Sequence, residues 1–123
     1  MKVLVIDDNA DIIEAVSICL DDAGVEYKTI DNGRDGLHEI RNHHYDLIVL
    51  DLAIPEFSGY DIIKALKDDG ILESKNIVIS TASSIVESDR NDLLALGAKD
   101  VLPKPYRRKD LMSVIARFNP ASK

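Results

Sequence analysis

Short runs of consecutive apolar residues alternate along this chain with longer stretches whose apolar residues recur every three or four positions. Three runs are continuously apolar and rich in valine and isoleucine: Val3 to Ile6, Leu47 to Leu50 and Ile77 to Ile79. Strands covered on both faces of a parallel sheet have this composition. A fourth strand, Glu26 to Ile30, alternates charged with apolar residues, and a fifth, Asp100 to Leu102, is very short. We expect these two at the sheet edges.

The stretches between the strands predict five helices, because their apolar residues fall on one helical face. Glycine follows the first, third and fourth of them, at Gly24, Gly70 and Gly97. A left-handed residue that closes a helix costs least where there is no Cβ. The strict alternation of strands and helices, joined by right-handed connections, predicts an α/β fold. We expect a doubly wound, five-stranded parallel sheet in the order 2-1-3-4-5, with five helices on its two faces. The apolar residues of the five helices are Ile12, Ile13, Val16, Cys19 and Leu20; Leu37 and Ile40; Ile62, Ile63 and Leu66; Leu93, Leu94 and Leu96; Leu111, Met112, Ile115 and Phe118.

Size and charge narrow the function. A chain of 123 residues has room for one domain, which we place at residues 1–119, with residues 120–123 as a short tail or truncated linker. The formal net charge of -7 argues against a nucleic-acid partner. The apolar runs are too short to cross a membrane, no signal peptide is expected, and the single cysteine, Cys19, suits a reducing compartment. We therefore expect a cytoplasmic protein.

Polar residues with complementary chemistry follow four of the predicted strands. Asp7 and Asp8 follow the first, Asp51 ends the third, Thr81 follows the fourth and Lys104 follows the fifth. The carboxyl ends of parallel strands meet at one edge of the sheet, where such folds bind ligands. Three clustered carboxylates repel one another unless a cation lies among them. Mg²⁺, which prefers hard oxygen ligands, is the expected cation.

Each of these residues also has an ordinary structural interpretation. Asp8 with Asn9 could cap a helix, Asp51 could accept a turn hydrogen bond, Thr81 could cap a loop, and Lys104 could be a solvated surface lysine. Together they form the set that phosphoryl transfer to a carboxylate needs: acids for a metal, a nucleophile, a hydroxyl donor and a fixed ammonium.

Several segments carry a resemblance to a known family. The chain resembles the receiver domains of two-component response regulators, of the single-domain, chemotaxis-regulator type, over about its whole length. The segments are Asp7-Asp8, Asp51-Leu52-Ala53-Ile54-Pro55 followed by Gly59, Thr81-Ala82, and Gly97-Ala98-Lys99-Asp100 running to Lys104-Pro105-Tyr106.

The resemblance implies a flavodoxin-like fold and a switch in which Asp51 accepts a phosphoryl group from a sensor histidine kinase or phosphotransfer protein. It further implies that Asp8, Asp51 and the backbone carbonyl of Ala53 bind Mg²⁺, with Asp7 acting largely through water. Thr81 and Lys104 would bind the phosphoryl oxygens. Such a protein catalyses only its own phosphorylation and dephosphorylation, and it signals to a downstream protein, which the sequence does not identify. From charge and hydropathy we expect neither direct nucleic-acid binding nor a membrane partner.

One residue departs from the family pattern. The fifth strand of receiver domains usually carries Tyr or Phe where this chain has Val101. Valine has no ring to relocate on phosphorylation. We therefore expect the response to be carried by the loop of residues 82–88 and the helix after it.

Three other functions fit the sequence less well. A haloacid-dehalogenase-like phosphatase needs a second Asp two places after the nucleophile, where this chain has Ala53. A nucleotide-dependent enzyme needs a glycine-rich signature after the first strand, which is absent. An interaction module that is never phosphorylated has no need of the complete acid, threonine and lysine set.

Overall fold

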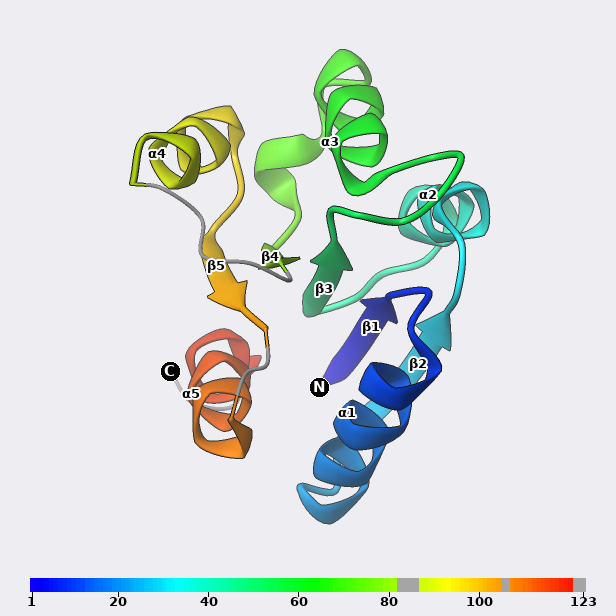
Figure 1. Cartoon of the computed structure of the whole chain (residues 1–123), viewed down its shortest axis with the longest axis vertical. Helices are drawn as coiled ribbons and strands as arrows, with labels where there is room; N and C mark the ends of the chain where they lie inside the picture. Colours follow the sequence, from blue (N-terminus) through cyan, green and yellow to red (C-terminus); the bar gives the residue numbers. More distant parts are fainter. Residues whose placement is uncertain (82–86, 105–106, 121–123) are drawn as a thin grey trace.

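Each continuously apolar run of the sequence forms a strand in the computed structural model, which describes residues 1–81, 87–104 and 107–120. Five parallel strands form one sheet in the order β2-β1-β3-β4-β5 (Figure 1), as the sequence predicts. The half-exposed β2 and the short β5 are the edges, also as predicted. The strands are β1 Lys2–Ile6, β2 Glu26–Ile30, β3 Leu47–Asp51, β4 Ile77–Thr81 and β5 Asp100–Pro103.

Local signals set the helix ends. The Asn9 side chain accepts hydrogen bonds from the amides of Asp11 and Ile12 and so caps α1. Gly24, Gly70 and Gly97 have φ values of 68°, 76° and 131°, so the predicted left-handed residues after three helices are confirmed. The helices are α1 Ala10–Asp22, α2 Gly33–Asn42, α3 Gly59–Asp68, the 3-10 turn η1 Leu72–Ser74, α4 Glu87–Leu96 and α5 Arg108–Phe118.

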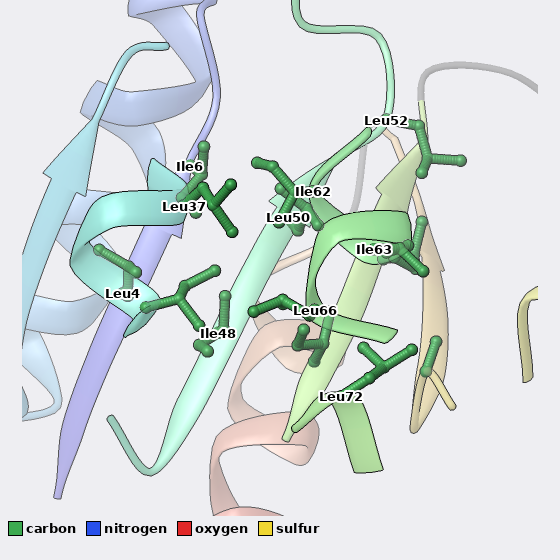
Figure 2. Close-up of a cluster of buried hydrophobic side chains, with 14 of the residues drawn as sticks. Leu4, Ile6, Leu37, Ile48, Leu50, Leu52, Ile62, Ile63, Leu66 and Leu72 are labelled. Atoms are coloured by element: carbon green, nitrogen blue, oxygen red, sulfur yellow. The ribbon is translucent and has the colours of Figure 1, made fainter. Parts of the chain in front are cut away.

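The helices cover the sheet on both faces, and each face has its own core. In Figure 1, α2, α3 and α4 lie on one side of the sheet and α1 and α5 on the other. Figure 2 shows the first core, where Ile48 and Leu50 of β3 meet Ile62 and Leu66 of α3. The second core joins alternate residues of the same strands to α1 and α5. A sheet buried on both faces explains why the central strands are apolar at consecutive positions.

Backbone hydrogen bonds extend beyond the strands at the carboxyl edge of the sheet. The Asp7 amide donates to the Ile30 carbonyl at 3.0 Å, and the Leu52 amide to the Ser80 carbonyl at 3.3 Å. The Lys104 amide donates to the Thr81 carbonyl at 2.6 Å. These bonds fix the backbone from which the candidate site residues project.

Candidate functional site

Three carboxylates meet at the carboxyl edge of the sheet. One oxygen from each of Asp7, Asp8 and Asp51 lies within 4.8 Å of the others. Asp7 and Asp51 are 2% and 3% exposed, whereas Asp8 is open to solvent. The predicted convergence of the ends of the first and third strands is therefore confirmed.

A buried ammonium group bridges two of these carboxylates. Lys104 Nζ lies 2.5 Å from Asp7 Oδ2 and 3.4 Å from Asp51 Oδ1. Its side chain is only 9% exposed, so the alternative of a solvated surface lysine is wrong. When all three carboxylates are ionised, one ammonium leaves two negative charges uncompensated, which is the charge that a divalent cation neutralises.

Short local contacts orient the acids. Asp7 Oδ1 accepts a hydrogen bond from the Asn9 amide at 2.9 Å, and Asp51 Oδ1 accepts one from the Ala53 amide at 3.1 Å. The residue that caps α1 is Asn9, which leaves the Asp8 carboxylate to the acidic cluster. Both Asp7 oxygens contact protein groups, so Asp7 is less available to a metal than Asp8.

Burial raises the pKa of the Asp51 carboxyl above its ordinary value. The Ala53 amide lowers the pKa, the neighbouring charge of Asp7 raises it, and Lys104 lowers it. Additional positive charge beside Asp51 would favour its ionised form, which is the form that acts as a nucleophile.

The donor set fits Mg²⁺. Carboxylate oxygens are hard ligands, and Mg²⁺ is usually held by one or two carboxylates together with substrate phosphate and water. Asp8 and Asp51 supply the two carboxylates, and the exposure of Asp8 leaves an open side for water and phosphate.

The remaining predicted residues lie around this cluster. Thr81 ends β4 and is partly exposed. Ala53, two residues beyond Asp51, is exposed and contacts the Asp51 carboxylate through its amide. The predicted responsive loop begins in residues 82–86, which lie outside the described residues, as do residues 105–106 of the Lys104-Pro105-Tyr106 motif.

A cleft of about 720 Å³ opens beside Asp7 and Asp8, between α1, the end of β2 and α2. Sequence reasoning missed this cleft. Its lining combines four further acids with Lys28 and His38, and these residues lie far apart in the sequence with no shared spacing to reveal them. The four acids are Glu14, Asp31, Asp35 and Glu39.

Comparison with known proteins gives consistent matches. The model of the response regulator receiver domain matches residues 3–116. Among solved structures, a receiver domain of the Francisella response regulator 1452 superposes with a TM-score of 0.88 at 25% identity, covering 99% of this chain and 98% of that one. The Vibrio cholerae chemotaxis protein CheY4 gives a TM-score of 0.83 at 29% identity, covering 95% of this chain and 97% of that one.

Curated relatives are longer than this chain. The probable transcriptional regulatory protein SilR of Salmonella typhimurium is 34% identical over 113 residues, which are 92% of this chain and 48% of the relative. The transcriptional regulatory protein CiaR of Streptococcus pneumoniae is 34% identical over 111 residues, which are 90% of this chain and 48% of the relative. The chain thus spans about half the length of these relatives.

These names bear on two of the predictions. Since the relatives are named as transcriptional regulators, the predicted absence of a nucleic-acid partner gains no support from them.

In the described part of the chain, every helix is too short or too polar to span a membrane. The cytoplasmic location and the division of the chain at residues 119 and 120 stay predictions.

Proposed function

The chain belongs to the response regulator receiver domain family, and from this membership we propose that it is a phosphorylation switch whose acceptor is Asp51. The donor is a phosphohistidine of a sensor kinase or phosphotransfer protein, and the reaction depends on Mg²⁺. The observation that carries the proposal is the convergence of three carboxylates with an ammonium held between Asp7 and Asp51.

In the first reaction, an Asp51 carboxylate oxygen attacks phosphorus, a bond forms between them, and the bond from phosphorus to the donor nitrogen breaks. Bound Mg²⁺ would supply positive charge against the phosphoryl oxygens, with Asp8 and Asp51 as its carboxylate ligands. Lys104 holds a second positive charge at the site, in a largely water-free position. The hydroxyl of Thr81 donates to a phosphoryl oxygen.

In the second reaction, water attacks phosphorus and the bond to the Asp51 oxygen breaks. The electron pair returns to the carboxylate, inorganic phosphate leaves, and the attacking water gives up a proton. Ala53 carries no acid or base at the position where a phosphatase of the haloacid dehalogenase type needs one. The protein therefore catalyses only its own phosphorylation and dephosphorylation.

A small-molecule donor tests the assignment of the acceptor. Acetyl phosphate with Mg²⁺ is expected to add one phosphoryl group to the protein, and Asp51→Asn is expected to prevent this. Intact-mass measurement gives the result. Asp68→Asn, which changes an exposed carboxylate on α3, is the matched control and should be labelled like the wild type.

Two outcomes would contradict the proposal. Full labelling of Asp51→Asn would place the acceptor elsewhere. A wild-type protein that is never labelled, with acetyl phosphate or with a kinase, would instead indicate an interaction module that has kept the receiver fold.

A further inference from the structure

The hydroxyl of Ser80 is buried without a hydrogen-bond partner. Ser80 is 1% exposed, and its Oγ is the one buried side-chain oxygen or nitrogen that lacks a partner among the residues that the structure describes. Buried polar groups are nearly always paired, since an unpaired one loses its hydration without compensation. A hydroxyl in this state is available to a group that changes at the site.

Strand pairing places this hydroxyl beside Asp51. Ser80 of β4 is the direct register partner of Asp51 of β3, and on its other side it pairs with Leu102 of β5. Neighbouring strands lie about 4.8 Å apart, and register partners in a parallel sheet direct their side chains to the same face. Val49 and Val78, two residues earlier on each strand, belong to the core under α1 and α5, so Asp51 and Ser80 also face that side.

We propose that the Ser80 hydroxyl donates a hydrogen bond to the carboxyl group of Asp51 and thereby shortens the lifetime of the acyl phosphate; this inference rests on the proposed function. A rotation about the Cα–Cβ bond of Ser80 moves the hydroxyl between staggered positions and needs no movement of β4. In hydrolysis, the electron pair of the breaking bond between phosphorus and oxygen returns to Asp51, so negative charge develops on the acceptor of this hydrogen bond.

The direction of the effect follows from the charge. A hydrogen bond to an oxygen that is gaining negative charge is stronger than one to a neutral ester oxygen, so the donor stabilises the transition state of hydrolysis more than the acyl phosphate. Removal of the hydroxyl should slow hydrolysis. From the difference between charged and neutral hydrogen bonds, we expect the lifetime to increase about fivefold.

The test compares four proteins that are phosphorylated with acetyl phosphate and Mg²⁺ and then rapidly separated from the donor. Loss of the phosphoryl group is followed by intact mass. We expect the acyl phosphate of Ser80→Ala to last about fivefold longer than that of the wild type. In Ser80→Thr, which keeps the hydroxyl, it should decay at the wild-type rate. Ile77→Val, a loss of packing at the far end of the same strand, should leave the lifetime unchanged.

A second readout separates this role from a structural one. Because Ser80→Ala removes an unpaired buried hydroxyl, the melting temperature of the unphosphorylated protein should not fall. An acyl phosphate that decays at the wild-type rate or faster in Ser80→Ala would overturn the inference. So would a lifetime in Ser80→Thr as long as that in Ser80→Ala. Failure to label the wild type would instead overturn the proposed function, and this inference with it.

Discussion

Glu39 is a buried carboxylate on α2 with two partners from different elements. Tyr45, just before β3, donates its hydroxyl to Glu39 Oε1 at 2.6 Å, and Lys28 of β2 donates to Oε2 at 3.3 Å. The hydrogen bond from Tyr45 lowers the pKa of Glu39 more than burial raises it, and Lys28 lowers it further. The charged form of Glu39 thus stabilises the folded chain, and β2, α2 and the start of β3 are joined through one side chain.

Tyr45→Phe should lower the free energy of unfolding at neutral pH by about 1–3 kcal/mol, because Glu39 Oε1 loses its buried donor. A lowered pKa in the folded state contributes stability above the ordinary value of 4.5, and this contribution is lost as the pH falls through the folded-state pKa. The difference between wild type and variant should therefore narrow in acid. Urea unfolding across this range measures it, and Tyr60→Phe, at a residue that is 53% exposed, should show no difference. A difference that widens in acid would contradict the assignment.

At the scale of elements, the approach of α3 to β3 requires a residue without a side chain. A Cβ on Gly59, the first residue of α3, would overlap the Asp51 carbonyl oxygen and lie 2.7 Å from the Leu52 Cα. Backbone atoms cannot move aside as a side chain can. The start of α3 is thus packed directly against the segment that carries Asp51.

Gly59→Ala should lower the free energy of unfolding by about 1–3 kcal/mol and reduce labelling by acetyl phosphate, because Asp51 must shift. Gly36→Ala is the matched control. That residue also lies in a helix, but its Cβ would meet side-chain atoms of Ile6, at 2.8 to 3.2 Å, and not backbone atoms. Thermal melts and intact mass give both readouts. If the two variants lose labelling equally, the contact with Asp51 is not responsible.

We expect Val101 to influence which elements respond to phosphorylation. Val101 lies on β5, is 8% exposed and packs in the core under α2, α3 and α4. Valine has no ring, and this side chain is already buried, so phosphorylation cannot bury an aromatic ring at this position. With a beryllium fluoride mimic of the phosphoryl group, we expect large amide NMR shifts over residues 82–96 and small ones at the Val101 methyls. The first residues of this range, 82–86, lie outside the described part of the chain.

Thr81→Ala should abolish the loop response without preventing phosphorylation, because in the proposed switch the threonine hydroxyl links the phosphoryl group to the loop. A change of rotamer at Val101 as large as the response of the loop would show that the switch works by another route. So would a loop response that survives Thr81→Ala.

The elements were predictable where a local pattern determines them. β3 is buried on both faces and is therefore apolar from Leu47 to Leu50, whereas β2 is buried on one face and alternates apolar with polar residues. Gly24, Gly70 and Gly97 mark the ends of helices because they adopt positive φ values. The 3-10 turn at Leu72–Ser74 has too few residues for a period.

The site was predictable as a set of strand-end residues, because parallel topology brings strand ends together. Contacts between side chains were not. Nothing local distinguishes Lys104 from a surface lysine, and only the tertiary structure places its ammonium between Asp7 and Asp51. The unpaired hydroxyl of Ser80 depends in the same way on the burial of its surroundings.

At the scale of the whole molecule, we expect the proposed metal site to couple Mg²⁺ binding to folding. The proposed ligands come from the segment between β1 and α1 and from the end of β3, so the set exists only in the folded sheet. A ligand that binds only the folded state stabilises it by RT ln(1 + [L]/Kd), about 1.4 kcal/mol at roughly ten times Kd. The melting temperature should therefore rise with Mg²⁺ and return to its starting value with a chelator.

Asp8→Ala should abolish the rise with Mg²⁺ and stabilise the metal-free protein, because it removes repulsion among the acids. Asp11→Ala, which changes an exposed acid in the first turn of α1, should keep the full response to Mg²⁺. Equal shifts in the wild type and Asp8→Ala would exclude Asp8 as a ligand.

The ion pair between Asp7 and Lys104 joins the first strand of the sheet to the segment after its last strand. During synthesis, the three acids of the site are added to the chain before Lys104. Until β5 has emerged and paired with β4, a nascent chain carries the acids of the site without the lysine that holds two of them together. We therefore expect a chain that ends before Lys104 to keep Asp51 but to be labelled by acetyl phosphate more slowly than the intact protein.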